Sequence, residues 1–152
     1  MAPRMLVVEN ICGAIDGGAL SALERDYLVM TFEERRWLRR RVTTRNGREI
    51  ALALPTGTVL APGTILLVEP NWYLEIEAAL EPVLAVSPRD RAAAIRIAFE
   101  VGNHHFRLAL DGEALLIPDD PAMTQMLDRL GARWDRRLAP FDPIGHGHNH
   151  ER

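Results

Sequence analysis

Short apolar runs separated by turn residues fill the first half of the chain. Each run is strand-like in length and is flanked by glycine, proline, asparagine or aspartate. The runs cover residues 5–8, 27–30, 38–44, 49–54 and 64–68. This pattern predicts an all-β unit in which Asn46-Gly47 forms a tight hairpin, because both central residues of such a turn need positive φ. Pro55-Thr56-Gly57 and Pro62-Gly63 predict two further turns.

The hydrophobic period changes in the second half of the chain. Residues 74–78 and 82–86 look extended, and a helix follows in which Ser87 is expected to be the N-cap. Gly102 is expected to end this helix in the left-handed conformation. Four apolar residues of the helix fall on one face, namely Ala92, Ile95, Ala98 and Phe99.

A hairpin, a second helix and a last strand complete the pattern. The hairpin covers residues 106–110 and 114–117, the helix residues 121–130 and the strand residues 133–138. The methionines at helical spacing, Met123 and Met126, are expected in the core rather than in a cofactor site. The order βαββαβ is the ferredoxin-like arrangement. We therefore predict an α+β fold with a β-rich N-terminal domain (1–77), a ferredoxin-like domain (78–144) and a flexible histidine-rich tail (145–152).

Composition excludes several kinds of chemistry. The chain has 152 residues, of which 47% are hydrophobic and 26% charged, with a net charge of -3. All 18 positive residues are arginine, so a P-loop lysine and a Schiff-base lysine are both excluded. Cys12 is the single cysteine, which excludes an internal disulfide. Without a signal-peptide core or a membrane-spanning apolar run, the protein is expected in the cytoplasm.

The five histidines occur in two clusters, and three of them lie in the sequence GHGHNHER at the end of the chain. In an extended backbone His146, His148 and His150 point to the same side. Gly147 allows the chain to fold so that neighbouring imidazoles reach one ion. This alternation favours a metal-binding tail over an ordinary solvated end.

His104 and His105 form the second cluster, just after the first predicted helix. Two adjacent imidazoles that leave a strand on opposite faces cannot complete the coordination shell of a first-row metal. A two-fold dimer changes this count, because His105 on the axis would supply one ligand from each subunit. Tail histidines would then fill the remaining positions.

Two other readings of the sequence are weaker. The run from Arg35 to Arg41 is basic with an interleaved tryptophan, which suits a nucleic-acid surface, but the net charge is negative. A metal hydrolase would need a carboxylate base beside the ion, and no His-Glu-x-x-His motif is present. A peptide- or nucleic-acid-binding module with incidental metal binding is therefore the alternative to a metal carrier.

Several motifs together resemble the urease accessory metallochaperones of the UreE type. They span nearly the whole chain in the family's order and include the alanine-rich helix with Gly102-Asn103-x-His105, Thr31 to Arg36, Gly47 to Leu60, Leu127-x-x-Leu130-Gly131-Ala132, and Phe141-x-Pro143 before the glycine-histidine tail. The resemblance implies a homodimer whose N-terminal domain binds a partner protein and whose C-terminal domain dimerises and holds nickel.

The resemblance also implies residue roles and partners. His105 would be the ligand at the dimer interface, whereas His104 stands where relatives more often have arginine or lysine. The short tail implies few bound ions rather than nickel storage, and zinc and copper suit the same imidazole ligands. The implied function is nickel delivery during urease maturation without catalysis by this chain. The implied partners are a nickel-binding GTPase and the urease assembly complex, with neither nucleic acid nor membrane.

Overall fold

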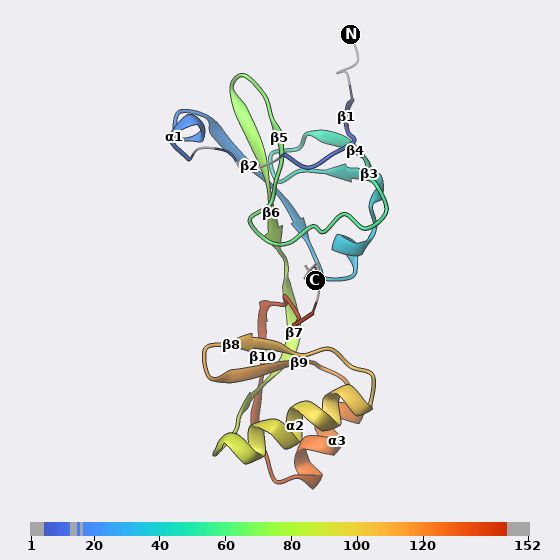
Figure 1. Ribbon diagram of the computed structural model, residues 1–152, viewed down its shortest axis with the longest axis vertical. Coiled ribbons are helices and arrows are strands. Elements are labelled where there is room, and N and C mark those ends of the chain that lie inside the picture. The colour runs from blue at the N-terminus through green and yellow to red at the C-terminus, as the bar shows by residue number, and fades with distance from the viewer. Residues whose placement is uncertain (1–4, 13–14, 16, 146–152) are drawn as a thin grey trace, which may run out of the picture. The chain divides into compact units, whose positions relative to one another are not determined.

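Two compact units make up the chain, Met1–Ala78 and Ala79–Arg152. The computed structural model describes residues 5–12, 15 and 17–145 (Figure 1). The sequence pattern set the domain boundary after residue 77. The roles that it assigned to the two domains remain predictions.

The first unit contains two three-stranded sheets. One has the order β1-β4-β3, with β1 parallel and β3 antiparallel to β4, and the other has the order β2-β6-β5, with β2 parallel and β5 antiparallel to β6. The strands are β1 (Leu6–Val8), β2 (Glu24–Met30), β3 (Arg39–Thr43), β4 (Glu49–Ala53), β5 (Ile65–Val68) and β6 (Trp72–Ala78). The predicted β-rich unit is confirmed. Among the described residues of this unit, the pattern missed two short turns of helix, α1 (Gly17–Leu20) and η1 (Glu34–Arg36).

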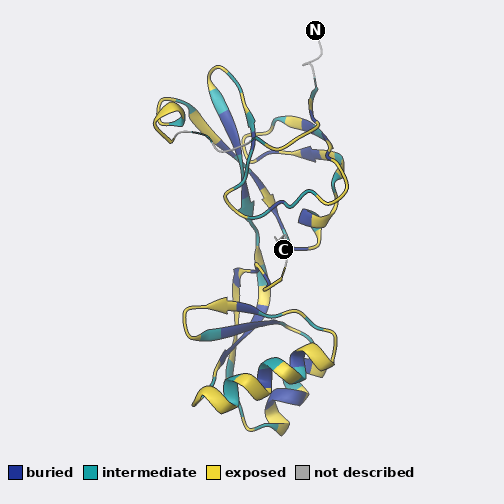
Figure 2. Ribbon diagram, viewed as in Figure 1, coloured by how far each residue is buried: buried dark blue, intermediate teal, exposed yellow. Residues whose placement is uncertain are grey.

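Alternating apolar residues of both sheets form the core of the first unit. In β4 the side chains of Ile50 and Leu52 are buried, and in β2 those of Leu28 and Met30, as a period of two requires. These residues belong to one apolar cluster with Leu66 and Leu74 of the second sheet. The two sheets therefore share a single core (Figure 2).

The hairpin between β3 and β4 differs from the predicted two-residue turn. The N–H of Gly47 donates to the carbonyl of Thr44 (3.0 Å), and the N–H of Thr44 donates to the carbonyl of Arg48 (2.8 Å). Gly47 has φ +87°, but Asn46 is not left-handed. The loop is thus one residue longer than expected, and only the glycine needs positive φ.

The second unit is a four-stranded antiparallel sheet of order β10-β7-β9-β8, with two helices on one face (Figure 1). In chain order the elements are β7 (Leu80–Ser87), α2 (Arg91–Asn103), β8 (Ala109–Asp111), β9 (Ala114–Pro118), α3 (Pro121–Arg129) and β10 (Arg133–Pro140). This is the predicted βαββαβ order, and the ferredoxin-like arrangement is confirmed.

The helices bury one stripe each against the sheet. In α3 the buried side chains are Met123, Met126 and Leu127, as predicted. In α2 they are Ile97 and Val101. The stripe that the sequence singled out in α2 faces outward instead, because Ile95 is 59% and Phe99 67% exposed. Helix α2 therefore carries two apolar stripes, of which only one packs within its own chain.

The helix N-terminus was also predicted wrongly. Ser87 is the last residue of β7, and the N-cap of α2 is Asp90, whose carboxylate accepts the N–H of Ala93 (2.8 Å). Asp120 caps α3 in the same way through the N–H of Ala122 (2.8 Å). Aspartate suits this position because its carboxylate also meets the positive end of the helix dipole.

Candidate metal centre

His105 holds an unusual backbone conformation at the end of α2. Its φ is +61°, and it is the one non-glycine residue of the described chain in the left-handed region. Its N–H donates to the carbonyl of Gly102 (3.0 Å), and the N–H of Phe106 donates to that of Val101 (3.1 Å). This pair of bonds is a Schellman motif with His105 in the position that glycine normally takes.

Helix α3 ends in the same motif but with glycine. The N–H of Gly131 donates to the carbonyl of Asp128 (3.1 Å) and that of Ala132 to Leu127 (2.9 Å), and Gly131 has φ +68°. The prediction that Gly102 would be the left-handed residue of α2 is wrong, because Gly102 lies inside the helix. The left-handed position is filled three residues later by a histidine.

Both histidines of this cluster are exposed. His104 is the C-cap of α2, and its Nε2 lies 4.0 Å from the Glu100 carboxylate one turn earlier. Phe106, which follows His105, packs against the core of the unit. The Schellman motif and Phe106 therefore anchor the backbone on the C-terminal side of an imidazole that faces solvent.

The segment after β10 returns to this end of the unit. Phe141 and Pro143 are buried, and the N–H of Ile144 donates to the carbonyl of Leu108 (2.7 Å). Leu108 follows His105 by three residues, and Ile144 precedes His146 by two. At about 3.5 Å per extended residue, this bond brings the start of the tail within reach of His105.

Part of the predicted ligand set lies outside the described residues, namely His146, His148 and His150. Within residues 5–12, 15 and 17–145, no group of three or more histidine, cysteine, aspartate or glutamate side chains could hold a metal ion. His104 and His105 alone do not make a site in one chain. Cys12 is half-buried, with its backbone N–H bonded to Ile65 (3.0 Å).

Part of the basic run of the first unit is engaged within that unit. Arg35 is fully buried and donates to the carbonyl of Met30 (3.0 Å). Arg40 pairs with Glu34 (3.2 Å) and lies 5.1 Å from the centre of the Trp37 ring. These contacts remove much of the support for a nucleic-acid surface.

Sequence reasoning missed the bond between Ile144 and Leu108. Nothing local marks either residue, because the contact joins segments that only the sheet brings together. The buried Phe141 and Pro143 were noted as a motif, and their burial gives that motif a structural reason.

The described part of the chain also contains no helix long and apolar enough to cross a membrane. The cytoplasmic location stays a prediction.

The structure thus defines a two-domain α+β protein with a histidine pair at the end of its first ferredoxin-like helix. Two family models match it in the same order. The N-terminal domain of UreE urease accessory protein matches residues 8–79, and the C-terminal domain matches residues 81–152. The chain belongs to the UreE family of urease accessory proteins.

Individual relatives agree with this assignment. A urease accessory protein UreE of Ralstonia nicotianae is 39% identical over 81% of this chain, which spans 60% of that protein. Proteins of the same name from Cupriavidus necator and Cupriavidus pinatubonensis are 37% and 36% identical over 96% of this chain, covering 79% and 68% of their own lengths.

Proposed function

We propose that this protein is a nickel-binding metallochaperone that delivers nickel during urease maturation and catalyses no reaction itself. It acts as a homodimer in which His105 of each subunit binds a shared ion. Histidines of the tail, His146, His148 and His150, complete the coordination, and His104 is a further candidate ligand. Family membership supports the role in urease maturation.

The hydrogen bond between Ile144 and Leu108 is the observation that carries the metal site. It ties the base of the tail to Leu108, in the segment between His105 and β8 (2.7 Å). Histidines from two distant parts of the sequence can therefore contribute to one ion. One cluster supplies ligands at a fixed position, and the other supplies ligands on a tail that can release the ion. Only the two clusters together supply both.

The exposed stripe of α2 supports a dimer through the second unit. Ile95 and Phe99 are large apolar side chains that their own chain leaves exposed, and His104 and His105 follow directly at the end of this helix. An isologous interface over this stripe would bury apolar surface and bring two copies of the helix end near one axis. The second half of the ligand set comes from the partner subunit.

The identity of the metal and of the partners rests on the family. Imidazole binds nickel, copper, zinc and cobalt, and the general affinity order ranks copper above nickel. The proposed partners are a GTPase of the same pathway and the urease assembly complex, and the β-rich unit is the proposed surface for a partner protein.

Two variants separate the roles of the histidine clusters. His105→Ala removes one ligand per chain, and ending the chain at Gly145 removes the three tail histidines. In nickel calorimetry on the dimer, His105→Ala is expected to abolish the tightest binding. Truncation is expected to lower the ion count or weaken binding while one ion per dimer remains. Circular dichroism establishes that both variants are folded.

The opposite result would overturn the shared site. If the truncated protein loses all nickel while His105→Ala keeps full affinity, the tail alone binds the metal. Replacement of Cys12 by alanine is the matched control, because it removes another metal-binding side chain that the proposal does not use. Its nickel affinity should equal that of the natural chain.

A further inference from the structure

A hollow of about 540 Å³ lies in the second unit, between the N-terminal half of α2, the end of α3 and the start of β10. Its apolar part includes Ile97 and Leu130, and four arginines surround it: Arg89, Arg96, Arg129 and Arg133. This volume is within the range of small-molecule sites in proteins. Its lining, taken over the part of the chain that the structure describes, includes no acidic side chain.

The arginines of the hollow differ from others in the same unit. On β10, Arg136 pairs with Asp119 (3.2 Å) and Arg137 with Asp135 (3.1 Å). Arg96, Arg129 and Arg133 make no hydrogen bond or ion pair to any described side chain, and Arg89 only approaches Asp90 (3.9 Å). Arg129 lies in the last turn of α3, where a cation offsets the helix dipole. That explanation does not extend to the other three.

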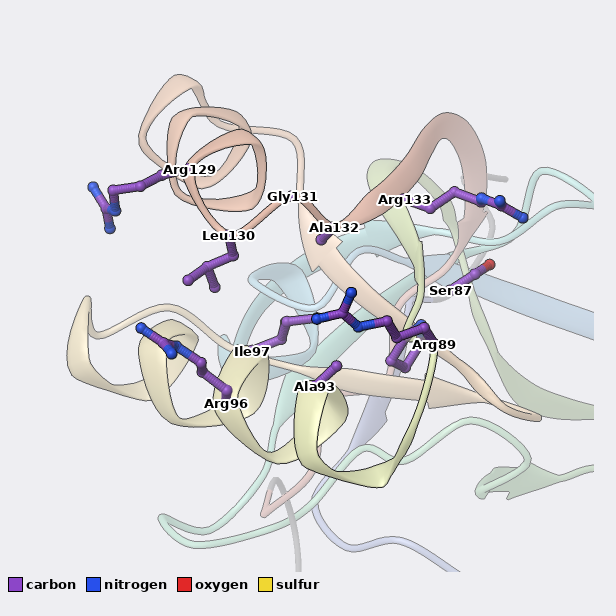
Figure 3. A pocket seen from close by; sticks show the side chains of 11 residues that line it. Ser87, Arg89, Ala93, Arg96, Ile97, Arg129, Leu130, Gly131, Ala132 and Arg133 are labelled. Atoms are coloured by element: carbon purple, nitrogen blue, oxygen red, sulfur yellow. The ribbon is translucent and has the colours of Figure 1, made fainter.

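The four guanidinium groups come from four places in the chain and are spread along the hollow. In Figure 3 the side chain of Arg89 crosses the space between α2 and β10, Arg96 and Arg129 lie on one side, and the side chains of Arg129 and Arg133 extend outward in opposite directions. All four arginines are exposed, and apart from the approach of Arg89 to Asp90 they have no acidic partner among the described residues, so their charge is available to an anion. Cations on both sides of a hollow suit a ligand with several anionic groups better than a single small ion.

We propose that this hollow binds a small polyanion that carries two or more phosphate or carboxylate groups. The arginine fork donates two parallel hydrogen bonds to either group, which makes arginine the natural partner of both. The apolar floor at Ile97 and Leu130 contacts the carbon skeleton of the ligand. The hollow is distinct from the proposed metal site, because Ile97, the residue of α2 in its lining that is nearest to His104 in sequence, lies seven residues before it, or about 10 Å along a helix.

Calorimetry on the metal-free full chain tests the proposal, after dialysis to remove chelators, which are themselves polycarboxylates. The probes are tripolyphosphate and citrate, with sulfate as a single anion and a polyglutamate peptide as a macromolecular polyanion. Tripolyphosphate, citrate or both should bind one per chain, more tightly than sulfate, and the comparison identifies the preferred group. Binding should weaken as salt is raised, because the contacts are charged and partly exposed.

A pair of double variants assigns the binding to the hollow. The double variant Arg96→Gln with Arg133→Gln should raise the Kd for the bound probe about tenfold or more, because each lost arginine removes charge-assisted hydrogen bonds. Arg91→Gln with Arg41→Gln removes the same charge from exposed positions outside the hollow and should leave the Kd within about twofold. Nickel titration of both variants should match the natural chain, so failure of the metal proposal would be seen separately.

Three results would overturn the polyanion site. The first is that neither tripolyphosphate nor citrate binds. The second is that sulfate binds as tightly as they do. The third is that the control variant loses as much affinity as the variant of the hollow. Binding of polyglutamate alone would also reject the small-molecule site and indicate a docking surface for an acidic protein.

Discussion

His105 occupies a position at which this fold favours glycine. The equivalent position of α3 is Gly131, with the same hydrogen-bond pattern and a similar φ. A side chain with a Cβ in the left-handed region costs about 1 kcal/mol, although histidine tolerates it better than most residues. Such strain at an exposed histidine is a reason to test the proposed ligand role of the side chain separately from stability.

Replacing His105 with glycine should separate stability from metal binding. His105→Gly is expected to raise the free energy of unfolding by about 0.5 to 1 kcal/mol, measured by urea denaturation without metal. His105→Ala, which keeps the strain, should not stabilise the protein. Both should lose the tightest nickel binding. A glycine variant that is no more stable than the alanine variant would contradict the assignment of backbone strain to residue 105.

Asp26 is the most deeply buried carboxylate among the described residues, and it organises the hairpin that follows β3. Burial by itself raises the pKa of Asp26. Hydrogen bonds from the Thr44 hydroxyl, the Arg48 guanidinium (2.9 Å) and the N–H groups of Asn46 (3.1 Å) and Tyr27 (2.8 Å) outweigh it and hold the pKa below its ordinary value of 3.8.

The lowered pKa of Asp26 predicts a loss of stability in acid. Its contribution is complete above about pH 4 and disappears as the pH falls through the lower pKa of the folded state. Asp26→Asn should therefore cost about 2 kcal/mol at pH 7 and less in acid, where the natural chain also loses the charge. Urea denaturation at pH 7 and pH 3 measures both differences. A cost that stays constant between these pH values would contradict the assignment.

At the scale of elements, sequence patterns predicted the kinds of element better than their ends and faces. Short apolar runs bounded by turn residues identified the β-strands of the described residues, because run length and turn chemistry are local properties. In α2, however, Ile95 with Phe99 and Ile97 with Val101 are both apolar stripes at helical spacing. Periodicity cannot decide which of two such stripes packs on a sheet. Likewise Ser87 and Asp90 are both good caps, and the extension of β7 to Ser87 decided between them.

The segment after β10 gives an element-scale prediction. Ile144→Pro removes the N–H that bonds to Leu108 and should weaken nickel binding several-fold while the fold stays intact, because the base of the tail is no longer held beside His105. Ile144→Ala keeps the N–H and is the control. Calorimetry on both, with circular dichroism, makes the comparison. Equal affinities would mean that this anchor does not serve the metal site.

At the scale of the whole molecule, the exposed stripe of α2 predicts a dimer that forms without metal. Light scattering of the metal-free protein should report twice the chain mass of 17.0 kDa, about 34 kDa. Phe99→Asp should shift the protein toward the monomer at micromolar concentration, because it places a charge in the apolar interface. Val7→Asp, at a position 55% exposed in the first unit, is the matched control and should remain dimeric. A metal-free natural chain of 17.0 kDa would refute this assembly.

Long-range contacts account for what the sequence did not predict about the sites. The two histidine clusters were evident from composition, but their connection depends on Ile144 and Leu108, which are separated by the whole of β8 to β10. The arginines of the hollow are likewise scattered over residues 89–133 among eighteen positive residues. Only the folded sheet and helices show which of them share a surface.

The bond between Ile144 and Leu108 also bears on how the cargo is handed over. Tethering a ligand close to its ion makes binding intramolecular, with an effective concentration on the order of millimolar for a short linker. Capture is then favoured over loss to dilute competitors in solution. A docked acceptor protein presents its own ligands at a comparable effective concentration, so it competes with the tail on equal terms. In the proposed delivery role, nickel release would therefore depend on docking, and the length of the tether would set how tightly an acceptor must dock.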